Sequence, residues 1–61
     1  MTERYEVVEE AAGQRLDAWL AATLGVARAE AQRLVDGGSV VVGGTPRRKS
    51  HAVAAGDLVD V

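Results

Sequence analysis

The chain has 61 residues, which is enough for one small domain and too few for the roomy cleft of most enzymes. It contains no cysteine and one histidine, His51, so a disulfide framework, a thiolate metal site and a histidine-based metal cluster are excluded. No apolar run approaches the roughly 20 residues that span a bilayer. We therefore expect no cofactor, no bound metal, no membrane partner and a cytoplasmic location.

Charge is spread unevenly along the chain. The total is −2, and residues 1–12 and 50–61 carry −3 and −2, whereas residues 13–49 carry +3. This distribution is compatible with one basic face on an otherwise acidic domain, and such a face suits nucleic acid. It is also compatible with charges scattered over a solvated surface, so charge alone leaves both interpretations open.

The first predicted element is a strand over residues 5–9, where Tyr-Glu-Val-Val-Glu is rich in strand formers and Gly13 follows. A stripe of apolar residues then predicts a helix that starts at Arg15 and ends at Gly25. The stripe consists of Leu16, Trp19, Leu20 and Leu24. Asp17 falls in the first turn of this helix, where a negative charge interacts favourably with the helix dipole.

A second helix is predicted over residues 28–36, with a stop at Gly37 and Gly38. Its buried stripe consists of Ala27, Ala31, Leu34 and Val35. Arg28 and Gln32 are four residues apart and stack on the flank of that stripe, while Glu30 and Arg33 can pair in solvent. Only two or three residues separate the two helices, so we expect a tight helix-turn-helix hairpin.

The last third of the chain predicts strands. Residues 39–42 are rich in valine, and Gly43-Gly44 is a strong signal for a two-residue hairpin turn. The returning segment 45–50 contains Pro46, which favours a sheet edge. Gly56 and Asp57 predict another turn before a final strand over residues 58–61. The resulting fold class is α+β in the order β-α-α-β-β-β, with the helices on one face of a small sheet.

No set of residues predicts catalysis within this chain. The chain contains the residue types of a Ser-His-Asp catalytic triad, namely Ser39 or Ser50, His51 and Asp57. It has no nucleophile-elbow motif that would position them. The glycine pairs do not lie between a strand and a helix, so they do not form a phosphate-binding loop. Trp19 lies on the apolar stripe, where core packing is favoured over base stacking.

Basic residues are the better candidates for a functional site. Arg47, Arg48 and Lys49 follow the predicted hairpin turn, and Arg28 lies near the start of the second helix, whose N–H groups attract phosphate. Guanidinium groups match phosphate oxygens with two parallel hydrogen bonds. The alternative is a solvated basic edge that prevents sheet-to-sheet aggregation, and residue types alone do not decide between the two.

Several motifs occur together in a specific order. They are Arg15-Leu16-Asp17-x-x-Leu20, Ala27-Arg28, Leu34-Val35-x-x-Gly38-x-Val40-x-Val42-Gly43-Gly44, and Gly56-Asp57-x-Val59-x-Val61. Over residues 13–61 the chain thus resembles the S-four RNA-binding domain. The lead-in over residues 5–14 resembles the N-terminus of RluA/RluD-type RNA pseudouridine synthases, in which this module precedes a larger catalytic domain.

The resemblance implies two antiparallel helices packed on a small twisted sheet, with structured RNA, chiefly ribosomal, docking on the second helix and the neighbouring hairpin. The residues that it places on this surface are Arg15, Arg28, Gln32, Arg47, Arg48 and Lys49. The synthases have a catalytic aspartate in an Arg-Leu-Asp-x-x-Thr-Ser-Gly motif. Here an amphipathic helix follows Asp17, so we expect this residue to pair with nearby donors at a helix start.

We therefore interpret residues 1–61 as a single RNA-binding domain of a longer protein, with residues 1–12 as a leading strand or arm. The parent is expected to be an RNA pseudouridine synthase, an isomerase, whose catalytic domain follows this chain. Two alternatives stay open. In the first, the chain is a free-standing RNA-binding module or a module from another RNA-linked protein. In the second, it is a protein-interaction domain that no longer binds RNA.

Overall fold

A computed structural model describes residues 3–61 and shows two α-helices and four short strands in the order β-α-α-β-β-β. The elements are β1 (Arg4–Glu6), the 3-10 helix η1 (Glu9–Ala11), α1 (Leu16–Leu24), α2 (Arg28–Asp36), β2 (Val41–Val42), β3 (Thr45–Pro46) and β4 (Leu58–Asp60). The predicted α+β class and its element order are confirmed.

The four strands form one antiparallel sheet in the spatial order β1-β4-β2-β3. Val59 of β4 is opposite Tyr5 on one side and Val42 on the other, and its side chain is fully buried. The strands β1 and β3 are the two edges. Pro46 lies in the edge strand β3, as its missing N–H group predicts.

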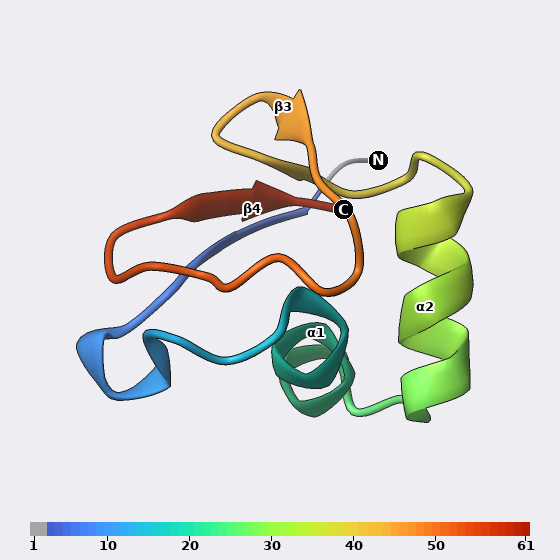
Figure 1. Ribbon diagram of the computed structural model, residues 1–61, viewed down its shortest axis with the longest axis horizontal. Coiled ribbons are helices and arrows are strands. Elements are labelled where there is room, and N and C mark those ends of the chain that lie inside the picture. Colours follow the sequence, from blue (N-terminus) through green and yellow to red (C-terminus); the bar gives the residue numbers. More distant parts are fainter. Residues whose placement is uncertain (1–2) are drawn as a thin grey trace.

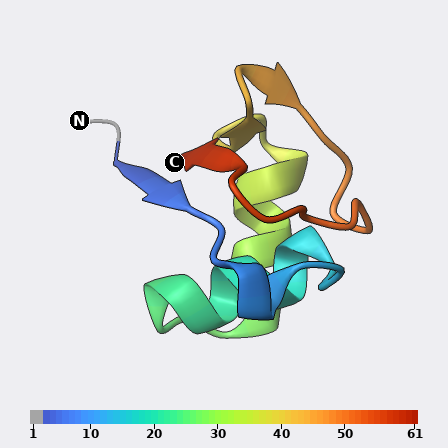
Figure 2. The same ribbon diagram turned by 90° about the vertical axis from the view of Figure 1, so that its left-hand side faces the viewer.

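The two helices form the predicted hairpin, joined by residues 25–27. Gly25 has a φ of 70°, and its N–H donates to the carbonyl of Ala21, so a left-handed glycine ends α1. Figures 1 and 2 show that α1 lies beneath the sheet, and that α2 stands beside it with its axis at a steep angle to that of α1. Within residues 3–61, neither helix has the length and apolar character needed to cross a membrane.

The core lies between the helices and the sheet. Its largest fully buried apolar side chains are Leu16, Leu20, Val7, Val40, Val53 and Val59. Trp19 is also buried, which confirms its predicted place in the core. The stripe on α2 is narrower than predicted, because Ala31 and Val35 are buried whereas Leu34 is half-buried and Ala27 is exposed. Ala27 is the N-cap of α2, at the end of the helix far from the sheet.

The predicted strand over residues 5–9 is too long. The strand β1 ends at Glu6, and Glu9–Ala11 curl into the 3-10 helix, which buries the small side chain of Ala11 against the core. Val8 keeps the extended backbone that valine favours, with φ of −76° and ψ of 159°, but the paired register with β4 ends at Glu6 and the chain turns at Glu9. The strand predicted over residues 39–42 is shorter as well, since only Val41–Val42 pair with neighbours.

The segment between β3 and β4 packs on the start of α1 and positions the site described below. The N–H of Leu16 donates to the carbonyl of His51 at 2.7 Å, and Arg15 forms an isolated antiparallel bridge with Ala52. These backbone bonds satisfy donors that a helix N-terminus otherwise leaves unpaired. Arg15, the N-cap residue, makes no side-chain capping bond in the described part of the chain.

Candidate nucleic-acid interface

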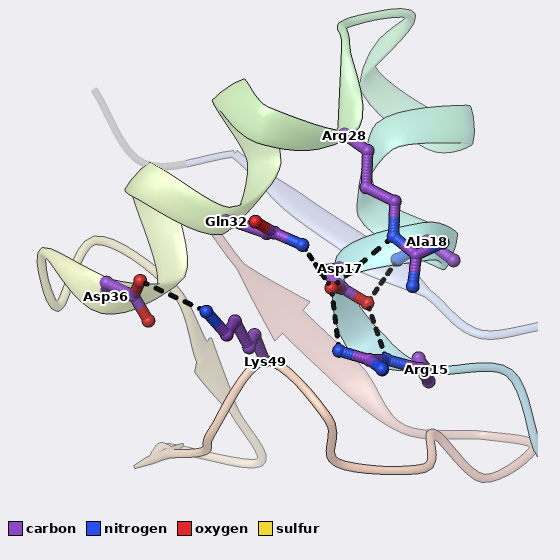
Figure 3. A network of polar contacts seen from close by, with 7 residues as sticks. All are labelled: Arg15, Asp17, Ala18, Arg28, Gln32, Asp36 and Lys49. Atoms are coloured by element: carbon purple, nitrogen blue, oxygen red, sulfur yellow. Dashed lines mark hydrogen bonds and ion pairs between the residues drawn. The ribbon is translucent and has the colours of Figure 1, made fainter.

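A buried carboxylate, that of Asp17, is the centre of the candidate site. Its side chain has no exposed surface, and it lies in the first turn of α1. One oxygen accepts a hydrogen bond from the N–H of Ala18 at 2.8 Å, and the other accepts one from Nε2 of Gln32 at 2.9 Å. Arg15 binds both oxygens, through Nε at 3.2 Å and Nη2 at 3.1 Å (Figure 3).

Arg28 approaches the same carboxylate from α2. Its Nε lies 3.5 Å from Oδ2 of Asp17, which makes an ion pair between the two helices. Arg28 and Gln32 lie four residues apart, so they share a face of α2, and that face turns toward α1. The structure therefore brings together three residues that the sequence singled out, namely Arg15, Arg28 and Gln32.

The hydrogen bonds around Asp17 determine its charge. Burial by itself raises the pKa of this carboxyl group, because it disfavours the charged form. The hydrogen bonds from Gln32, Arg15 and the N–H of Ala18, together with the positive charge of Arg15, lower the pKa to about 2. Asp17 is thus ionised at neutral pH. With two guanidinium groups and one carboxylate, the cluster keeps a net positive charge.

Both arginine side chains remain partly open to solvent. The side chains of Arg15 and Arg28 are 48% and 52% exposed, although both contact the fully buried Asp17. A guanidinium has five N–H donors. Arg15 uses two of them on Asp17, so three are left for another acceptor. Two such groups, held at one carboxylate on half-exposed side chains, can bind phosphate oxygens with charge-assisted hydrogen bonds.

The other predicted site residues follow β3. Arg47 and Arg48 are exposed, and among the described residues neither side chain forms a hydrogen bond or an ion pair with another side chain. Lys49 is half-buried, and its Nζ lies 3.9 Å from Oδ2 of Asp36 at the end of α2. Figure 3 shows the Lys49 side chain near Asp17 and directed toward Asp36, so Lys49 links the segment after β3 to the end of α2.

Acidic residues gather at the opposite edge of the sheet. Asp60 of β4 forms an ion pair of 2.7 Å with Arg4 of β1, and Glu3 accepts a hydrogen bond of 3.0 Å from the hydroxyl of Tyr5. Because β1 and β3 are opposite edges, Arg4 and its ion pair with Asp60 lie on the side of the sheet away from β3.

Sequence reasoning expected Asp17 to pair with nearby donors, and this is confirmed. It missed that this carboxylate is fully buried and joins both helices. A signal was present, because Asp17 lies three residues before Leu20 and seven before Leu24, on the apolar face of α1. The expected pairing of Glu30 with Arg33 is also confirmed, at 2.9 Å.

Comparison with known proteins agrees with this fold. The family model of the S4 domain matches residues 14–59, which include both helices, β2, β3 and most of β4. No curated protein matches the chain in sequence. A family match over more than half of the residues shows that the chain belongs to the S4 domain family, an RNA-binding type of domain.

Proposed function

We propose that this S4 domain binds structured RNA through one surface, and that ribosomal RNA is its target class. The proposed surface consists of Arg15, Arg28, Gln32, Arg47, Arg48 and Lys49. The observation that carries the proposal is the meeting of Arg15 and Arg28 at one buried carboxylate, with about half of each arginine side chain exposed. Fixed, exposed guanidinium groups are suited to the phosphate backbone.

Recognition on this surface depends mainly on phosphate contacts. The two large aromatic side chains do not offer a platform for base stacking, because Trp19 is buried and Tyr5 is half-buried and bonded to Glu3. A protein that contacts phosphates without stacking bases reads the shape of a folded RNA rather than its sequence. A structured RNA is therefore a better ligand for this surface than a single strand.

We further propose that the domain docks RNA for a pseudouridine synthase whose catalytic domain lies elsewhere in the parent protein. The lead-in over residues 5–14, followed by Arg15-Leu16-Asp17, supports this context through its resemblance to those enzymes. Asp17 itself is occupied by Arg15, Gln32 and the N–H of Ala18, which favours a structural role for it over a catalytic one. A ribosomal target implies action in the cytoplasm.

The experiment that tests RNA binding is a fluorescence-anisotropy titration of a ribosomal RNA hairpin at several salt concentrations. Each neutralised phosphate contributes about −0.7 to −0.9 to the slope of log affinity against log salt, so a surface with about four contacts gives a slope of about −3. The substitution Arg28→Ala is expected to make that slope shallower by about one.

Arg4→Ala is the matched control, because Arg4 pairs with Asp60 at the acidic edge of the sheet. It is expected to leave the slope unchanged. If no RNA binds below about 50 mM salt, where phosphate contacts are strongest, the proposal is wrong. If Arg4→Ala and Arg28→Ala change the salt slope equally, the proposal is also wrong. The domain is then better explained as a protein-interaction module.

A further inference from the structure

We infer that Asp17 is a positioning residue for RNA binding: its buried carboxylate holds the guanidinium groups of Arg15 and Arg28 at the spacing in which they bind phosphate. This inference rests on the proposed RNA binding and adds to it a residue that does not itself touch RNA. Asp17 is fully buried, so it does not contact RNA itself, and any positioning effect on RNA binding passes through the two arginines that it contacts.

Arg15 is held in a side-on fork. Its Nε and Nη2 bind the two oxygens of Asp17 at 3.2 and 3.1 Å, which fixes both the position and the plane of the guanidinium group. A long arginine side chain that is half exposed otherwise samples many rotamers, and RNA binding then has to immobilise it. The carboxylate removes that entropic cost before RNA arrives.

Arg28 is held through the same carboxylate but from the other helix. Its Nε lies 3.5 Å from Oδ2 of Asp17, and Gln32 donates to that same oxygen at 2.9 Å. Two guanidinium groups this close repel each other, and an anion between them offsets that repulsion. Asp17 therefore sets the distance between two cations that belong to different helices, which neither helix can do alone (Figure 3).

Net charge and positioning predict opposite changes in RNA affinity when the carboxylate of Asp17 is removed. If only net charge matters, removal of a carboxylate from a phosphate-binding surface makes that surface more positive and tightens RNA binding. If the carboxylate positions the arginines, its removal releases both side chains and weakens binding. The sign of the change in affinity therefore distinguishes the two explanations.

The test is the substitution Asp17→Asn, compared with Asp36→Asn. At the buried position an asparagine keeps the size of the side chain and an oxygen that can accept from the N–H of Ala18, but it lacks the charge that holds Arg15 and Arg28. Asp36 is a matched control, because it lies 3.9 Å from Lys49 of the same surface and is 62% exposed. Both substitutions remove one negative charge beside the basic residues.

We expect Asp17→Asn to bind a ribosomal RNA hairpin about ten-fold more weakly than the unsubstituted chain at the same salt, the scale of one lost charge-assisted contact. Asp36→Asn is expected to bind as tightly or more tightly. Circular dichroism at the assay temperature establishes that both variants are folded. A folded Asp17→Asn that binds as tightly as the unsubstituted chain, or more tightly, overturns the inference.

A second pair of variants leaves the buried carboxylate intact, so it tests the positioning of Arg28 even if Asp17→Asn does not fold. Arg28→Lys keeps the charge but loses the guanidinium group that Asp17 orients, so binding is expected to weaken several-fold. Arg33→Lys, on the exposed side of the same helix, is expected to have no effect. Where Asp17→Asn folds, adding Arg28→Lys to it is expected to weaken binding no further.

If Arg28→Lys binds as tightly as the unsubstituted chain, the positioning role is wrong although RNA binding stands. If the unsubstituted chain itself binds no RNA at low salt, the proposed function is wrong and this inference is wrong with it. The two failures are therefore distinguishable in one set of titrations.

Discussion

The backbone N–H of Asp17 donates a hydrogen bond of 3.1 Å to the carbonyl oxygen of Lys49. One residue of the basic segment after β3 is thus bonded directly to the residue that holds Arg15 and Arg28. The neighbouring bond from Leu16 to His51 fixes the same segment to the start of α1. These two bonds connect the two groups of basic residues through the backbone, so neither group can move far from the other while α1 is folded.

Asp17 makes the stability of the domain depend on pH in the acidic range. Its pKa is about 2 in the folded protein against an ordinary value of 3.8, so the fold favours the ionised form. This stabilisation is complete above about pH 5 and is lost as the pH falls from about 4 to about 2, with a size on the order of 2 kcal/mol.

The measurement is urea unfolding of the unsubstituted chain and of Asp17→Asn at several pH values between 7 and 2. The difference in free energy of unfolding between the two is expected to shrink by about 2 kcal/mol below pH 4. A difference that stays constant down to pH 2 contradicts the lowered pKa.

The leucines of the two helices are buried to different extents, so their removal is expected to cost different amounts of stability. Leu20 is fully buried, so Leu20→Ala is expected to cost about 2–5 kcal/mol and to abolish cooperative thermal unfolding. Leu34 is only half-buried, so Leu34→Ala is expected to cost less, about 1–2 kcal/mol. Circular dichroism melts measure both. A Leu20→Ala variant that melts near the temperature of the unsubstituted chain shows that the core is assigned wrongly.

The start of α2 lacks a side-chain cap. Ala27 is the N-cap residue, with φ of −66° and ψ of 150°, and within residues 3–61 no side chain caps this end. Ala27→Ser places a hydroxyl where it can accept from an unpaired N–H, and is expected to stabilise the domain by about 0.5–2 kcal/mol. The measurement is the midpoint of urea unfolding.

Ala29→Ser is the control for the cap. Ala29 is an exposed residue inside the same helix, where serine has a lower helix propensity than alanine, so a small loss of stability is expected. If Ala27→Ser leaves the midpoint unchanged or lowers it, the hydroxyl does not reach the helix N–H groups.

The hairpin between β2 and β3 depends on two glycines with positive φ. Gly43 has a φ of 58° and Gly44 one of 79°, as a two-residue hairpin turn requires. Gly44→Ala is expected to cost about 1–2 kcal/mol, because L-residues with a Cβ are strained in this region. Gly43→Asn is the control, since asparagine tolerates the left-handed region at the first turn position. Equal urea midpoints for the two variants contradict this account of the turn.

The sequence by itself determined the elements whose signals are local. Apolar spacing predicted both helices, Gly25 predicted the end of α1, and Gly43-Gly44 predicted the hairpin, because helix stripes and turn conformations depend on residues close together in the chain. The same local patterns, with the motifs over residues 13–61, were enough to indicate the family.

Only the tertiary structure decided how the predicted site residues are arranged. Local spacing puts Asp17 on the apolar face of α1, but the convergence of Arg28 and Gln32 on it depends on how α2 packs against α1, which no local pattern specifies. The end of the first strand likewise depends on its partner, because the paired register with β4 stops at Glu6. These features form because contacts between segments that are far apart in the chain bury apolar surface and pair a buried charge.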